Sequence, residues 1–116
     1  MIDASSDSVF GLFCGQLGNI LEKNGQHDAA IDLHKTCLAI FLKLGDKETA
    51  ASAHQNLGAV FKLNGKYEEA LVEYPSAAAI DKEIHGEDNP DVATTYSAIA
   101  EIYQCMEKYD ESLAEV

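Results

Sequence analysis

Residues 17–25 (LGNILEKNG) and residues 57–65 (LGAVFKLNG) share one pattern: Leu-Gly, then a large apolar residue after two positions and Gly after three more. The two copies begin 40 residues apart (57 minus 17). A third copy, residues 99–107 (IAEIYQCME), begins 42 residues later (99 minus 57), with Ala and Glu in place of the two glycines. The following residues agree as well: GQHDAA at 25–30, GKYEEA at 65–70 and EKYDES at 107–112. Two motifs that recur in the same register predict an internal repeat.

The apolar residues within each copy recur at helical spacing. Ala53, Leu57 and Val60, for example, lie three or four residues apart and so share one face of a helix. No segment alternates apolar and polar residues for long enough to predict a strand. Glycines suited to the left-handed conformation after a helix recur at positions 25, 45, 65 and 86. Together these signals predict six helices, over residues 7–24, 27–44, 47–64, 67–85, 90–105 and 108–116.

Two prolines refine this layout. Pro75 lies inside the fourth predicted helix, where a proline lacks the backbone donor and clashes with the preceding turn, at a cost of about 3 kcal/mol. We therefore expect a kink or break near Tyr74 and Pro75, with residues 76–84 as a redirected segment. Asn89 and Pro90 predict the start of the next helix, because asparagine caps helices and proline favours their first position.

Helices joined by such short turns form antiparallel hairpins. A single hairpin cannot bury its apolar residues alone, so hairpins stack into a superhelix. We expect an all-α fold in one domain, residues 1–116, with repeats over about 8–46 and 47–88 and an incomplete one over 89–116. The array would then comprise about two and a half repeats.

The chain resembles the tetratricopeptide repeat (TPR) family over residues 8–116. The residues that match the family consensus are Cys14, Leu17, Gly18, Leu21, Gly25, His27, Ala30, His34 and Cys37 in the first copy; His54, Leu57, Gly58, Phe61, Gly65, Tyr67, Ala70, Tyr74 and Ala77 in the second; and Tyr96, Ile99, Ala100, Tyr103, Tyr109 and Ser112 in the third. The resemblance implies a right-handed solenoid in which Gly18, Gly58 and Ala100 let the small residues Ala30, Ala70 and Ser112 approach. The 40-residue copies look like the repeats of Pins-type polarity scaffolds, and residues 86–93 (GEDNPDVA) look like those of kinesin light chains. Both groups bind proteins and are not enzymes.

In this family the first helix of each hairpin lines a concave groove that binds extended or helical peptides. The resemblance therefore implies a peptide groove lined by Asn19, Lys23, Ser52, Gln55, Asn56, Lys62, Thr94 and Glu101. Asn19 and Asn56 suit a peptide backbone, because an amide both donates and accepts. Co-chaperone members of the family hold a terminal carboxylate with lysine and arginine beside two asparagines. The corresponding basic positions here are Gly15, Thr94 and Ala98, so we do not expect that clamp.

The charge of the chain excludes several classes of partner. It has 20 acidic residues, 8 lysines and no arginine, for a net charge of −12. Nucleic acid and anionic membranes are repelled by such a surface. No apolar run approaches the ~18 residues that span a membrane. Residues 59–116 carry 13 of the acids and residues 1–58 carry 7. This acidity either keeps the chain soluble or favours a basic or apolar partner.

No constellation of residues predicts catalysis, a metal or a cofactor. Cys14, Cys37 and Cys105 are widely spaced and fit small packing residues in a reducing compartment. His34 and His54 replace aromatic packing residues of the repeat. The acidic start lacks the basic region of a secretory signal, so we expect an intracellular and cytoplasmic protein, with an organelle open if a targeting peptide is removed.

Three functions remain open from the sequence. The first is a non-enzymatic scaffold that binds a partner peptide or protein in the groove. The second is a structural subunit or fragment of a larger assembly, docked through an uncovered C-terminal end at Ile102, Tyr103 and Tyr109. That end could equally serve self-association or be covered by further repeats. A docking unit appended to an enzyme is a third alternative.

Overall fold

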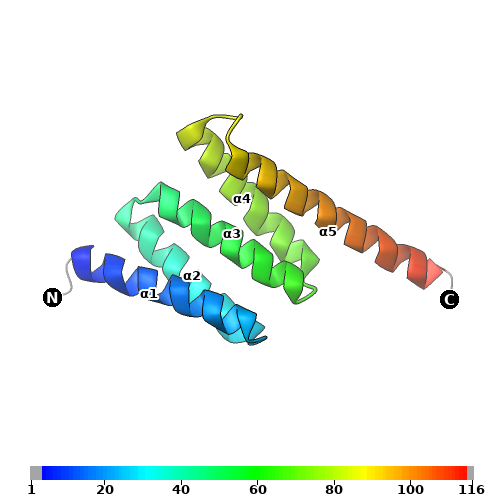
Figure 1. Ribbon diagram of the computed structural model, residues 1–116, viewed down its shortest axis with the longest axis horizontal. Helices are drawn as coiled ribbons and strands as arrows, with labels where there is room; N and C mark the ends of the chain where they lie inside the picture. Colours follow the sequence, from blue (N-terminus) through cyan, green and yellow to red (C-terminus); the bar gives the residue numbers. More distant parts are fainter. Residues whose placement is uncertain (1–3, 115–116) are drawn as a thin grey trace.

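The computed structural model describes residues 4–114, and their side chains from residue 6 to residue 107. This part of the chain forms five helices and no strand: α1 (Ala4–Lys23), α2 (His27–Leu44), α3 (Lys47–Leu63), α4 (Tyr67–His85) and α5 (Pro90–Ala114). Consecutive helices run antiparallel and pack side by side, with α1 at one edge of the array and α5 at the other (Figure 1). The predicted all-α helical repeat is confirmed.

The first four helices end where the glycines predicted. Gly25, Gly45, Gly65 and Gly86 all have positive φ, between 76° and 86°. After α2, for example, the Gly45 N–H donates to the Leu42 carbonyl and the Asp46 N–H to the Phe41 carbonyl. Asp46 then caps α3, accepting from the Thr49 N–H at 3.1 Å and from its hydroxyl at 2.7 Å. The turn chemistry thus sets the helix lengths.

Two other glycines allow the helices of each hairpin to approach closely. A Cβ on Gly18 would lie 2.8 Å from Cε1 of His34, and one on Gly58 would lie 2.9 Å from Cδ2 of Tyr74. The sequence predicted a close approach at both glycines, but to small residues of the facing helix. Those alanines are fully buried, yet the His34 and Tyr74 rings lie directly against the glycines.

The core consists of two clusters of buried side chains. The larger joins α2, α3, α4 and α5, and its members are Ala30, Ile31, Leu57, Val60, Phe61, Ala70, Tyr74 and Ile102. The smaller joins α1, α2 and α3, and its members are Cys14, Cys37, Phe41, Ala50 and Ala53. The three cysteines are free thiols, and Cys14 and Cys37 are buried packing residues as the sequence predicted.

The helix that contains Pro75, α4, is uninterrupted, so the expected break near Tyr74 and Pro75 is wrong, while the change of direction over residues 76–84 stays a prediction. Pro75 is exposed, whereas Ala77 on the opposite side of α4 is fully buried. The hydrogen bond that proline removes therefore lies on the side where water can reach the freed carbonyl. The Ser76 hydroxyl also donates to the Val72 carbonyl at 2.9 Å, within the same turn. Packing of the inner face outweighs the local penalty of the proline.

The predicted turn between a fifth and a sixth helix is absent, which is a second correction. α5 runs without interruption from Pro90 to Ala114, through the position where a turn was expected. In the first two copies that turn is made by Gly25 and Gly65, but the third copy has Glu107 there. A side chain at positive φ is penalised, so the helix continues instead. As a result α5 extends beyond the other helices, and no helix of residues 4–114 lies on its outer side (Figure 1).

Candidate peptide-binding groove

A hollow of about 150 Å³ opens between α1 and α3, with α2 beneath it. Its lining residues are Leu12, Gly15, Gln16 and Asn19 of α1, Cys37 of α2, and Thr49, Ser52, Ala53 and Asn56 of α3. Three of the predicted groove residues, Asn19, Ser52 and Asn56, therefore lie together. None of these nine residues is charged, so the hollow offers amides, hydroxyls and small apolar groups.

The two asparagines are the polar groups best placed to bind a ligand in this hollow. Both are half-buried, and within residues 6–107 neither amide is hydrogen-bonded to another group. The Ser52 hydroxyl is held only by a long contact of 3.5 Å to the Glu48 carbonyl. An amide presents both donors and an acceptor, so each of these side chains has the groups that pair with a peptide group.

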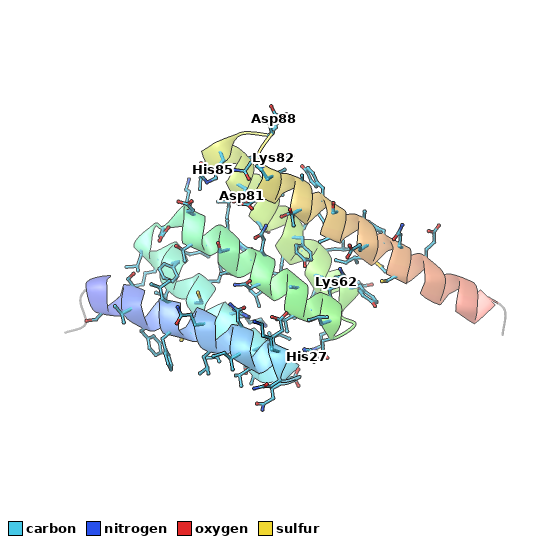
Figure 2. All side chains as sticks on the ribbon, in the orientation of Figure 1. His27, Lys62, Asp81, Lys82, His85 and Asp88 are labelled. Carbon is cyan, nitrogen blue, oxygen red and sulfur yellow. The ribbon has the colours of Figure 1, made fainter. Side chains whose placement is uncertain are left out.

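Four other predicted groove residues are engaged within the chain. Gln55 Nε2 donates to the Thr95 hydroxyl at 2.7 Å, and Lys62 forms an ion pair with Glu101. Figure 2 shows Lys62 near the end of α3, on the side of α5. These contacts tie α5 to α3. The Thr94 hydroxyl donates to the Pro90 carbonyl at 3.0 Å, within its own helix. The signal missed in the sequence was the complementary charge of Lys62 and Glu101.

Lys23 and the predicted terminal end lie outside the hollow. Lys23 is exposed in the last turn of α1. Ile102 is fully buried in the larger cluster, because it faces α4, so it is a core residue rather than part of an exposed end. Tyr103 is 58% exposed, on the outer side of α5. Tyr109 lies outside the residues whose side chains are described.

The tetratricopeptide repeat family model matches residues 11–74 and 48–115. The chain belongs to the tetratricopeptide repeat family.

Solved structures agree with this TPR assignment. The crystal structure of BtubC (BKLC) from P. vanneervenii superposes with a TM-score of 0.80 at 24% identity, over 90% of this chain and 42% of that chain. The TPR domain of Arabidopsis FLU superposes with a TM-score of 0.65 at 21% identity, over 97% of each chain. At these identities the likeness shows the fold alone. The TPR chain spans less than half the length of BtubC, and none of the curated proteins matches it.

Buried polar groups of this TPR domain lie away from the hollow. His34 is fully buried, and neither of its ring nitrogens has a hydrogen-bond partner among the described residues. Burial lowers the pKa of His34 below its usual range. The His54 ring, in contrast, lies 2.7 Å from a Glu73 carboxylate oxygen across α3 and α4. Both histidines therefore pack between helices, as the repeat pattern predicted.

Ionisable side chains of both signs lie near the end of α4, where Asp81, Lys82 and His85 gather near the turn to α5 (Figure 2). Asp81 is only 6% exposed, and burial together with the nearby charge of Asp91 raises the pKa of its carboxyl. The sequence signal was present: Asp81 follows Tyr74 and Ala77 at helical spacing, on the buried face. No three His, Cys, Asp or Glu side chains of residues 6–107 converge as a metal site requires.

No helix within residues 4–114 combines the length and apolar character needed to cross a membrane.

Proposed function

We propose that this TPR domain is a non-enzymatic scaffold that binds a segment of a partner protein in the hollow between α1 and α3. TPR repeats generally mediate protein–protein interactions. The observation that carries the proposal is the pair of half-buried amides, Asn19 and Asn56, which face one hollow without partners among the described residues.

The chemistry of the hollow describes the peptide that it fits. The two amides bind peptide groups of an extended segment, and small or apolar side chains fit beside Leu12 and Ala53. Gly15 stands where a carboxylate clamp needs a cation, so a free C-terminus gains nothing there. The net charge of −12 disfavours acidic peptides. The expected ligand is an internal, neutral or basic segment.

A displayed library of random peptides tests this proposal. Peptides selected on the wild-type domain are expected to lose at least tenfold in affinity with Asn56→Ala and to lose binding with Ser52→Trp, which fills the hollow. Thr36→Trp is the matched control, because Thr36 is exposed on α2 outside the hollow. Selected peptides that bind Ser52→Trp and the wild type equally would refute groove binding.

A second candidate is a structural subunit that docks through the outer side of α5. Tyr96 and Tyr103 are 46% and 58% exposed there, and Lys82 Nζ lies 4.8 Å from the centre of the Tyr96 ring. Ala100, between the tyrosines, is the counterpart of Gly18 and Gly58 in the other copies, where the facing helix covers the glycine.

The two candidates predict opposite mutational patterns. A partner docked on α5 is lost from the purified complex with Ala100→Glu and retained with Ser52→Trp. A partner in the groove shows the reverse.

A further inference from the structure

The outer face of α1 carries four exposed apolar side chains: Val9, Phe10, Phe13 and Ile20, which are 67%, 54%, 58% and 55% exposed. α1 is the edge helix of the array, and α2 and α3 cover only its inner side (Figure 1). Val9, Phe10 and Phe13 also line a shallow hollow on this side. Within the described residues, no other helix covers this face.

The packing of α1 on α2 is made by residues of its inner face and does not involve these four residues. Gly11, Cys14 and Gly18 are buried against α2, where Phe41 and His34 meet the two glycines. The outer face is therefore available to another molecule. Isolated exposed apolar residues are ordinary, but a contiguous patch of a few hundred Å² marks an interaction site.

The size of the patch fits pairing with an identical patch. Since a whole aromatic side chain carries about 150–250 Å², the four half-exposed side chains present on the order of 400 Å² per copy. Two copies would together bury on the order of 800 Å² of apolar surface. A standard interface buries about 1,600 Å², of which about 57% is apolar. Two α1 faces thus supply nearly all the apolar area that a stable interface needs.

The distribution of charge favours a second copy of this chain as the occupant. Residues 8–21 (SVFGLFCGQLGNIL) contain no charged residue, in a chain of net charge −12. Counting Lys against Asp and Glu, residues 1–58 have a net charge of −3 (4 minus 7) and residues 59–116 of −9 (4 minus 13). Contact through α1 places the strongly acidic halves at opposite ends of the pair, where repulsion is weakest.

We propose that the outer face of α1 binds the same face of a second copy, in an antiparallel two-fold dimer. In such a pair Val9 of one copy packs near Ile20 of the other, and Phe13 lies near the axis. The two-fold arrangement closes after two copies, whereas contact between α1 and the open side of α5 would continue into a filament. The dimer displays two peptide grooves, but it does not depend on what they bind.

Sedimentation velocity of the 116-residue chain, from micromolar to hundreds of micromolar, tests the dimer. The expected mass rises from 12.6 kDa to twice that value and no further. Phe13→Glu is expected to remain at 12.6 kDa throughout, with the helical circular dichroism of the wild type. Val72→Glu is the matched control, because Val72 is 64% exposed on α4, away from α1; it should still dimerise.

Three outcomes would overturn the proposal. The first is a wild-type chain that stays monomeric at every concentration. The second is a dimer that survives Phe13→Glu, which would remove the contact from α1, or a dimer that is dissociated by Tyr103→Glu, which would place the contact on α5. The third is growth beyond two copies, which would indicate stacking of α1 on α5.

Discussion

The two complete hairpins, α1–α2 and α3–α4, share one backbone but differ in which buried position is polar. At the glycine contact the first hairpin has His34 and the second has Tyr74. Seven residues further along the same helix, the first hairpin has buried Phe41, and the second has buried Asp81 at the equivalent position 40 residues later. Each hairpin therefore carries one buried polar residue where the other carries an aromatic one.

At the first of these positions the ring changes from an imidazole to a phenol, while the glycine that it meets, Gly18 or Gly58, is the same in both hairpins. Both rings sit within 3.0 Å of where a glycine Cβ would be. The contact at the glycine is steric, and the residue opposite tunes stability and its dependence on pH.

The largest effect is expected at the glycines. Gly18→Val and Gly58→Val should each lower the free energy of unfolding by about 3 kcal/mol, because the added side chain overlaps a buried ring, His34 or Tyr74. Urea denaturation measures this. Ala39→Val, at an exposed site of α2, controls for the helix propensity of valine. Equal losses in Gly58→Val and this control would contradict the close approach.

Exchanging the rings should shift stability in opposite directions. His34→Phe is expected to raise the free energy of unfolding by about 1–2 kcal/mol, because it removes two buried nitrogens without partners. Tyr74→His should lower it by a similar amount, and the two variants should be compared by urea denaturation at pH 8. A His34→Phe variant less stable than the wild type would show that the imidazole has a partner in solution.

The pH dependence of stability should follow His34. Its pKa is lowered in the folded state, so below its usual value near 6.5 the unfolded chain binds more protons than the folded one. Stability is thus fully present above about pH 6.5 and falls as the pH drops below it. Thermal melts from pH 8 to 5.5 should show a smaller decline in His34→Phe. Parallel declines in both proteins would assign the effect to other groups.

Asp81 should have a smaller effect of opposite sign. Burial and Asp91 raise the pKa of its carboxyl, so its charged form destabilises the fold at neutral pH, and the penalty disappears as the pH falls. Asp81→Asn is expected to raise the free energy of unfolding at pH 7 by about 1 kcal/mol. Asp28→Asn, at an exposed site of α2, is the control. No gain relative to that control would mean that the Asp81 carboxylate is solvated.

The exposed ion pair between Lys47 and Glu83 should matter least. It joins α3 to α4 at 2.8 Å, but both side chains are about 60% exposed. Lys47→Met is expected to change the free energy of unfolding by less than about 0.5 kcal/mol, and by less still in high salt. If the free energy of unfolding falls more in Lys47→Met than it rises in Asp81→Asn, this ranking is wrong.

Much of the fold was predictable from the sequence. The ends of α1 to α4 followed from the glycines and from Asp46, because a turn depends on residues next to each other in the chain. Asn19 and Asn56 were predicted to share a groove and do line one hollow. The repeat boundaries and the role of the groove remain predictions.

Other features depended on packing that a local pattern does not contain. Pro75 stays within a continuous helix because its neighbours on the inner side are buried. Lys62 and Gln55 turned out to contact α5 instead of facing an open groove, since their partners lie about 40 residues away. Ile102 is buried because α5 packs on α4 with that side inward.

The sequence by itself determined the helical repeat, because positive-φ glycines, caps and apolar spacing act within one or two turns of the chain. Only the tertiary structure decided which polar residues are buried without a partner, as at His34, and which apolar residues are left exposed, as on the outer face of α1. Burial depends on which helix lies opposite each residue. That arrangement is a property of the stacked array and not of any single repeat.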